Sequence, residues 1–373
     1  MRVLICGGGV VGASIAYFLA CRGAEAIVVE RTGLACAASG KSGGFLARDW
    51  CDGTKLQRLA RRSFALHAEL ARTLGGDGWG YRRLDTWGGF GSMQDDRRRG
   101  GTAGDVDWVS DRVTAHRRLG STETTAQVHP GAFTSAMMRA AEARGATLRL
   151  GQVTGVVRDT NAAHVTGIEV DGETIAGDAV VIAMGPWSIL AAQWLPLPGV
   201  FGLKGHSLVF DTGTRIPAQA LFIDYEEPSG DVQSPELFPR RDGTTYVCAI
   251  SSESPLPVDP ADVGPDPGAI ERLEAMCRHM SPALGGARIL ARQACYRPVT
   301  RDGLPLIGRV ADLENAYVAT GHSVWGILNA PATGEAMAEL ILDGAARTVD
   351  LAPFDPARLR PFDPARLQLH ATG

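Results

Sequence analysis

The sequence predicts a mixed α/β fold, in which a Rossmann-like domain is interleaved with a second domain built on an antiparallel sheet. The chain opens with a strand, a glycine turn, a helix and a second strand, and after residue 298 it returns to strand, glycine loop and helix. Between residues 187 and about 295, prolines and turns separate short strands. A chain of 373 residues also exceeds what one compact core accommodates, so we expect two domains.

The opening segment carries the most specific motif. Apolar residues 2–6 lead into Gly7-x-Gly9-x-x-Gly12, helical apolar spacing follows to residue 21, and a second apolar run ends at Glu30. Gly7 permits a tight turn, Gly9 lets the backbone approach a pyrophosphate, and Gly12 lets the helix pack closely on the strand. Glu30 is placed to accept hydrogen bonds from an adenosine ribose, which argues against a 2′-phosphate. The turn predicts a bound dinucleotide but does not separate NAD from FAD.

The remaining elements follow from periodicity and turn residues. We expect a solvated loop at 88–104 that contains Arg97-Arg98-Arg99, with an anion site there as the less favoured alternative. The run 178–184 is nearly all apolar, which is typical of a buried parallel strand. The tail repeats Pro-Phe-Asp-Pro-Ala-Arg-Leu at 353–359 and 361–367, and we interpret it as a peripheral extension. Other predicted helices are 55–74, 131–144, 269–280 and 331–342, and other predicted strands are 147–150, 155–158, 167–170, 207–210, 245–250 and 316–320.

Composition excludes several classes of function. A net charge of −4 gives no electrostatic reason to bind nucleic acid or an anionic membrane, and no apolar stretch is long enough to span a bilayer. The first residues run directly into the glycine turn and leave no room for a signal peptide, so we expect a cytoplasmic protein. Seven cysteines without CxxC or Cys/His spacing indicate neither a disulfide framework nor a metal site.

Three further segments favour a flavin. The small, polar segment Ala38–Phe45 reads as a flexible loop whose amides could reach a pyrophosphate or a flavin ring. Near the C-terminus, Arg297–Gly308 leads through a strand to Thr320–Gly334. Together these segments resemble the glycine oxidase and D-amino-acid oxidase superfamily of flavoproteins. The likeness extends in order over nearly the whole chain, including Gly185-Pro186-Trp187. In the middle domain, from residue 187 to about 295, only the general character of short strands and turns matches the family.

The resemblance implies FAD as the cofactor and a discontinuous FAD-binding domain. That domain would comprise 1–85, 128–190 and 298–373, and the substrate domain 86–127 and 191–297. In the family, the N-terminus of the C-terminal helix faces the flavin pyrimidine, so amides near residues 325–327 would stabilise negative charge on reduced flavin. The implied cofactor contacts are Gly7, Gly9, Val10, Val11, Gly12, Glu30, Arg31, Ala38, Ser39, Lys41, Ser42, Gly43, Gly44, Phe45, Val153, Ala183, Gly185, Trp187, Cys295, Gly308, Gly321, His322, Ser323, Val324, Gly326 and Ile327.

Candidate substrate residues also come from the resemblance. Arg297 matches a glycine-oxidase arginine that holds the substrate carboxylate, the alternative being an arginine paired with a structural acid. Where glycine oxidases carry a second arginine, this chain has Val324, which puts glycine itself in doubt. Trp325 would present its ring to the substrate or shield the flavin. Lys204 is a further catalytic candidate, although we interpret it, like His206 and His322, more readily as structural.

Two residues raise separate hypotheses. Lys41 would favour reaction with oxygen if it lay beside the flavin, or it would bind phosphate. Cys295 stands at the spacing at which sarcosine-oxidase-like relatives attach flavin covalently. The interpretation we favour for Cys295 is a small buried hydrophobe, because most free cysteines are buried and inert.

The predicted activity is FAD-dependent oxidation of a carbon–nitrogen bond in a small amine or amino acid. A hydride would pass to flavin N5, the imine product would hydrolyse, and oxygen would yield hydrogen peroxide. A dehydrogenase that passes electrons to a quinone or a protein is one alternative, and a non-catalytic flavin-binding interaction protein is another. An NAD-dependent dehydrogenase is disfavoured because it leaves the motif at 320–334 unexplained.

Overall fold

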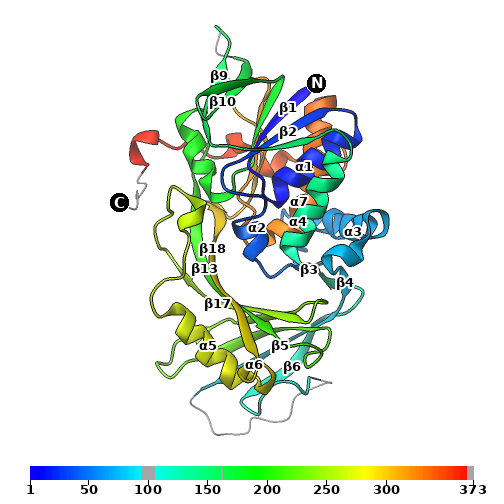
Figure 1. Cartoon of the computed structure of the whole chain (residues 1–373), viewed down its shortest axis with the longest axis vertical. Coiled ribbons are helices and arrows are strands. Elements are labelled where there is room, and N and C mark those ends of the chain that lie inside the picture. Colours follow the sequence, from blue (N-terminus) through cyan, green and yellow to red (C-terminus); the bar gives the residue numbers. More distant parts are fainter. Residues whose placement is uncertain (94–105, 161–162, 368–373) are drawn as a thin grey trace.

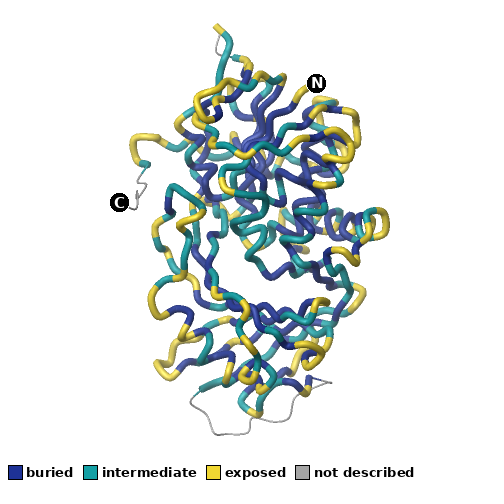
Figure 2. Tube along the Cα trace, viewed as in Figure 1, coloured by how far each residue is buried: buried dark blue, intermediate teal, exposed yellow. Residues whose placement is uncertain are grey.

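The computed structural model describes residues 1–93, 106–160 and 163–367. Its two large sheets occupy opposite halves of an elongated molecule (Figure 1). The half that contains both β1 (Arg2–Cys6) and α1 (Val10–Cys21) lies at the top of Figure 1, and the half with β17 (Thr244–Ser252) and α5 (Ala269–Met280) lies below it. Buried residues follow the strands of both sheets and the helices packed on the first sheet (Figure 2). This arrangement confirms the predicted fold class.

The first sheet is the predicted Rossmann-like sheet. Its strand order is β19-β20-β12-β1-β2-β8, and every neighbouring pair is parallel except β19 with β20. All four residues of β12 are buried, as predicted from the apolar run. The strands other than β1 are β2 (Glu25–Glu30), β8 (Thr147–Leu150), β12 (Ala179–Ile182), β19 (Leu306–Arg309) and β20 (Ala316–Thr320).

Helices α1 and α7 (Gly326–Asp343) pack against each other beside this sheet. An added Cβ at Gly334 would lie 2.6 Å from the backbone of Ser14, so this glycine allows the two helices to approach closely. Helix α3 (Gln57–Leu74) packs on α7, and α4 (Pro130–Glu142) packs on α1. The prediction that the last helix begins at residue 331 is wrong, because Pro331 lies inside α7, where the His67 ring donates the hydrogen bond that the proline cannot make.

The second sheet is mostly antiparallel, as predicted. Its strand order is β18-β13-β17-β16-β14-β5-β6, with β15 on the edge of β14, and only β14 and β5 pair in parallel. One face packs against α5 and the short α6 (Pro282–Gly285), where Leu273 and Met276 enter its core. The strands other than β17 are β5 (Asp85–Ser92), β6 (Val113–Gly120), β13 (Val200–Asp211), β14 (Gln219–Glu226), β15 (Val232–Gln233), β16 (Glu236–Pro239) and β18 (Arg288–Thr300).

Smaller elements complete the described fold. Two three-stranded sheets have the orders β11-β10-β9 and β3-β7-β4. Their strands are β3 (Phe45–Ala47), β4 (Arg82–Arg83), β7 (Thr125–Gln127), β9 (Val153–Arg158), β10 (Val165–Val170) and β11 (Glu173–Ala176). The 3-10 helices are η1 (Gly76–Trp79), η2 (Gly185–Gln193), η3 (Pro260–Asp262), η4 (Ser323–Trp325), η5 (Ala352–Phe354), η6 (Pro356–Arg358) and η7 (Pro364–Arg366). Within the described residues, no helix combines the length and apolar character that crossing a membrane requires.

Two further local predictions need correction. Residues 88–92 belong to β5 and pair with both β14 and β6, so they are not a solvated loop, while Arg97, Arg98 and Arg99 lie outside the described residues. The segment 38–45 is not simply a flexible loop, because residues 38–41 form the single-turn helix α2. An added Cβ at Gly40 would lie 2.2 Å from the Ala35 carbonyl oxygen, so only glycine fits this tight turn.

The duplicated tail is also more than a peripheral extension. Each copy forms the same 3-10 turn, in which Asp355 accepts a hydrogen bond from the Ala357 amide and the second copy repeats the arrangement. Phe354 of the first copy is only 1% exposed and packs in the core of the Rossmann-like half. Arg358 contributes a salt bridge to Asp302, with 2.8 Å between Nε and Oδ2. The first copy is therefore an integral part of the fold.

Candidate active site

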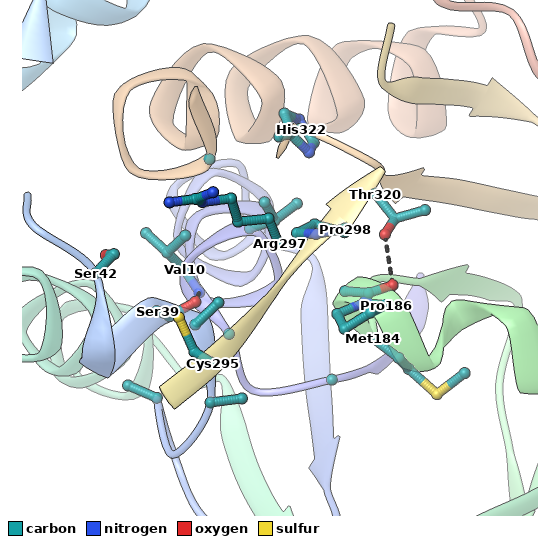
Figure 3. A pocket seen from close by; sticks show the side chains of 18 of the residues that line it. Val10, Ser39, Ser42, Met184, Pro186, Cys295, Arg297, Pro298, Thr320 and His322 are labelled. Atoms are coloured by element: carbon teal, nitrogen blue, oxygen red, sulfur yellow. Dashed lines mark hydrogen bonds between the residues drawn. The ribbon is translucent and has the colours of Figure 1, made fainter. Parts of the chain in front are cut away.

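A cavity of about 490 Å³ lies where the carboxyl ends of the parallel strands meet the second sheet. The glycine turn before α1 and the start of α7 both line it, although some 300 residues separate them in the chain. Figure 3 shows Val10 and Ser39 on one side of the cavity and His322 on another, with β18 between them. Predicted site residues that line the cavity are Gly7, Gly9, Val10, Val11, Glu30, Arg31, Ala38, Ser39, Ser42, Gly43, Gly44, Phe45, Val153, Ala183, Gly185, Trp187, Cys295, Arg297, His322, Ser323, Val324, Trp325, Gly326 and Ile327.

Four predicted cofactor positions do not line the cavity. An added Cβ at Gly12 would lie 2.0 Å from the Gly7 carbonyl oxygen, so Gly12 supports the turn by letting α1 pack closely. Gly308 faces Pro356 of the tail, and Gly321 turns the chain with φ +79° beside Thr300. Lys41 ends α2, where its carbonyl accepts a hydrogen bond from Gln293. The structure therefore gives Lys41 no direct position on the cavity wall.

Lys204 also lies off the cavity. Its ammonium group donates to Asp266 with 2.6 Å between Nζ and Oδ1, and the residue is only 8% exposed. His206 donates from Nδ1 to the Ile250 carbonyl and accepts from the Asp266 amide at Nε2, so this ring is fully occupied. Lys204 and His206 hold the segment around Asp266 against β13. These contacts agree with the interpretation that both residues are structural. The catalytic candidacy of Lys204 is not supported by its location.

The turn before α1 presents a set of donors suited to an anionic dinucleotide. Gly7 has φ +116°, and an added Cβ would lie 2.4 Å from the Ala183 carbonyl oxygen, so the turn requires glycine. The Glu30 carboxylate accepts from the Gly8 amide at 2.7 Å, and Glu30 lines the cavity. The first turn of α1 has no acidic side chain, and its N-terminus is positive by its dipole.

Ser42 offers a further group for a cofactor. Its hydroxyl oxygen is buried and has no hydrogen-bond partner among the described residues, yet Ser42 lines the cavity. Because buried polar groups are normally paired, this hydroxyl is available to a ligand. The unpaired hydroxyl, the glycine cradle and the helix N-terminus together fit a bound dinucleotide.

The beginning of α7 forms the opposite wall. Gly326 and Ile327 line the cavity, and the first turn of this 18-residue helix also lacks acidic side chains. His322 is hydrogen-bonded to the Thr333 hydroxyl with 3.0 Å from Nε2 to Oγ1, and burial lowers the pKa of His322 to about 4. The ring is therefore neutral at pH 7, which leaves the helix dipole as the positive feature of this wall.

Aromatic rings cover the part of the cavity nearest the second sheet. Phe45 stacks on Phe238 with 5.2 Å between ring centroids, and Trp50 lies 4.8 Å from Phe222. Trp325 meets Trp50 edge to face at 6.5 Å. All five rings line the cavity. They exclude water and lower the local dielectric, which strengthens any charge interaction made there.

Strand β18 contributes the predicted substrate residue. Arg297 and Cys295 are two residues apart, so they project from the same face of the strand, as Figure 3 shows. Arg297 donates from Nη1 to the Ser251 hydroxyl at 3.0 Å. An added Cβ at Gly205 would come within 3.3 Å of Nη2, so this glycine makes room for the guanidinium. Val324 lies in η4, just before α7, with 58% exposure and supplies no second cation.

Burial raises the pKa of the Cys295 thiol. A raised pKa reduces the thiolate fraction, and only the thiolate is strongly nucleophilic. Cys295 does line the cavity, so contact with a bound cofactor agrees with its location. Its protonated state favours the interpretation that it packs against the cofactor without bonding to it.

Several residues that line the cavity were not predicted from the sequence, because the middle domain carries no motif. Tyr246 and Cys248 alternate along β17 and face the cavity, and Glu236 pairs in register with Cys248 from β16. The period-two pattern of 244–252 could have indicated which side chains share a face, but not that this face borders a cofactor site. Phe222 and Phe238 were missed for the same reason, and Trp50 lies just beyond the end of the predicted cofactor segment 38–45.

Comparison with known proteins identifies the class. Residues 2–340 match the family model of FAD dependent oxidoreductases, so the chain belongs to this family. It is an oxidoreductase with FAD as its cofactor, as the sequence resemblance predicts.

Individual relatives cover almost the full chain. A Schizosaccharomyces pombe protein named as an oxidoreductase is 31% identical over 95% of this chain and 97% of its own. Glycine oxidase of Bacillus licheniformis is 30% identical over 95% and 96%, respectively. The crystal structure of glycine oxidase from Geobacillus kaustophilus superposes with a TM-score of 0.78 at 24% identity, covering 96% of this chain and 99% of that one.

Proposed function

We propose that this enzyme uses FAD to oxidise a carbon–nitrogen bond in a small amine or amino acid, with an imine as product and hydrogen peroxide formed from oxygen. The observation that carries the proposal is Arg297, which lines the same cavity as the glycine turn before α1 and the start of α7. Similarity to glycine oxidases supports the substrate class. The cofactor contacts proposed are the predicted residues that line the cavity.

Arg297 would orient the substrate through its carboxylate. Nη1 is bonded to Ser251, and a planar guanidinium has further N–H groups that can hold a carboxylate with two parallel hydrogen bonds. Trp325 and the neighbouring rings would cover the bound substrate and exclude water. We therefore assign to Arg297 the positioning of the substrate and to the aromatic rings the exclusion of water from it.

The start of α7 would provide the electrostatic contribution. Bound FAD supplies a hydride acceptor whose ring becomes negatively charged on reduction. The amides near Gly326 and Ile327 lie at the positive end of the α7 dipole and would stabilise that charge. His322 is neutral and bonded to Thr333, so we assign it a structural role beside this turn.

We also propose that the two sheets divide these roles. Segments 1–85, 128–190 and 298–373 would hold FAD, and 86–127 and 191–297 would hold the substrate. The cavity wall supports this division, since the glycine turn before α1 and the start of α7 come from the first set and both Glu236 and Arg297 from the second.

The test is anaerobic reduction of the FAD-loaded protein. Glycine, sarcosine, both enantiomers of alanine and proline, and simple amines are mixed with it, and loss of visible flavin absorbance is followed. At least one should bleach the flavin, and air should restore the colour at once with release of peroxide. Slow recovery in air would instead indicate a quinone or protein acceptor. Flavin that none of these compounds reduces would overturn the proposal.

A matched pair of variants tests the part played by Arg297. Arg297→Met should raise KM for an amino acid at least tenfold, because hydrogen bonds to a charged group contribute about 1.5–3 kcal/mol. Arg292→Met is the control, since Arg292 is an exposed residue of the same strand that pairs with Glu274. Equal effects of the two substitutions would contradict the assignment.

A further inference from the structure

Charged side chains are few on the cavity wall. Among the described residues that line it, they are Glu30, Arg31, Glu236 and Arg297. The first two are paired within the protein: Glu30 accepts backbone amides, and Arg31 forms a salt bridge with Asp259 at 3.2 Å. Arg297 donates a hydrogen bond to the neutral Ser251 hydroxyl, and Glu236 accepts one from the Cys248 thiol, which is a weaker donor. The second sheet therefore presents one carboxyl group and one guanidinium to the cavity.

Glu236 is a carboxylate without a basic partner. Its Oε2 accepts a hydrogen bond from the Cys248 thiol at 3.5 Å, and thiols are weak donors. Within the described residues, no lysine, arginine or histidine lies within salt-bridge distance of it. Phe222 is its cross-strand partner in β14, and the Phe238 ring lies on the same strand as Glu236. Burial raises the pKa of the Glu236 carboxyl, and the positive charge of Arg297 only partly opposes this effect.

This environment is unfavourable for a free carboxylate. A charge removed from water is stable only when it is paired, and a thiol compensates little of the lost hydration. A cationic ligand would supply the missing partner. The surrounding rings also attract cations through their faces, which adds to the preference for a positive group.

We propose that Glu236 binds the protonated amine of the substrate while Arg297 binds its carboxylate, so that the substrate class is small amino acids taken up as zwitterions. This inference rests on the proposed function. It explains how a chain with Val324 in place of a second arginine can still select an amino acid, because recognition is divided between one cation and one anion. A hydroxy acid would lose the contact with Glu236, and an amine without a carboxylate would lose the contact with Arg297.

The experiment uses the FAD-loaded full chain and a matched pair of probes, methylammonium and acetate. Binding is followed by the change in the visible absorbance of the flavin. Glu236→Gln should weaken methylammonium binding about 10- to 100-fold, the range expected for losing a charge-assisted hydrogen bond, and should leave acetate binding within about twofold. Arg297→Met should show the opposite pattern. Asp224→Asn is the control, because Asp224 is an exposed carboxylate of neighbouring β14 outside the cavity.

The outcomes separate this inference from the proposed function. Methylammonium that binds wild type and Glu236→Gln equally, or fails to bind wild type at all, overturns the role of Glu236 even if an amino acid bleaches the flavin. Weakened methylammonium binding supports that role even if no tested substrate reduces the flavin, in which case only the proposed function fails. If Glu236→Gln does not retain FAD, Glu236→Met replaces it with a neutral side chain of similar length, and the same criteria apply.

Discussion

Replacing His67 tests how α7 is held at the cavity. Pro331 has no amide hydrogen, so the Ile327 carbonyl lacks its usual helix donor. His67 of α3 supplies one, with 3.0 Å from Nε2 to the Ile327 oxygen and 3.2 Å to the Leu328 oxygen. Because both partners are acceptors, Nε2 must carry the hydrogen. One turn earlier on α3, Ser63 accepts from the Ala332 amide.

His67→Leu should therefore lower the free energy of unfolding by about 1–3 kcal/mol, the cost of leaving a buried acceptor unpaired. His67 is fully buried, so water cannot replace the lost donor. His67→Gln keeps an N–H donor, so its free energy of unfolding should decrease by less than about half of the decrease in His67→Leu. The assay is urea unfolding of the FAD-loaded protein, followed by far-ultraviolet circular dichroism and by the fluorescence of released flavin.

Two results would refute this reasoning. Wild type and His67→Leu could unfold at the same urea concentration, which would mean that the bond to Ile327 contributes nothing. Alternatively, the Leu and Gln variants could be equally destabilised, which would assign the loss to packing against Phe133 and not to the hydrogen bond.

The other predictions concern the cofactor turn, the cysteine and acid stability. Gly7→Ala should abolish FAD binding, because its Cβ would meet the Ala183 carbonyl; a variant that titrates with FAD like wild type would disprove it. Cys295→Ser should keep its flavin, and acid precipitation of wild type should leave the yellow colour in the supernatant; colour in the pellet would show a covalent bond. Burial lowers the pKa of both His67 and His322 from 6.5 to about 4, so the unfolded chain binds protons between these pH values that the folded protein does not. The free energy of unfolding should thus decrease as the pH is lowered from 6.5 to 4, by at most about 1.4 kcal/mol per pH unit for each histidine. His67→Gln should make this pH dependence shallower.

The Rossmann-like half was predictable from sequence because its signals are local. Residues 7–12 combine a strand end, a tight turn and a helix start within one motif, and strand 316–320 was predicted to the residue. The start of α7 was misplaced because Pro331 normally marks a first helical turn. His67, more than 250 residues away, supplies the donor that lets the helix begin earlier, and no local pattern contains that information.

The substrate side was less predictable. Arg297 came from a family motif, but the role of Glu236 depends on what lies across from it. Its cross-strand pairing with Cys248 sets which face it occupies, and register between distant strands is fixed by the tertiary fold. Lys204 shows the converse: the sequence offered it as a catalytic candidate and, more readily, as a structural residue, and Asp266 pairs with it away from the cavity.

The most direct measurement is a crystal structure of the FAD-loaded protein soaked with acetate. We expect the pyrophosphate on the turn at residues 7–12, the flavin ring beside the start of α7, and acetate within hydrogen-bond distance of Arg297. A flavin bound outside this cavity, or an FAD molecule that contacts only one of these two segments, would contradict the assignment of the site.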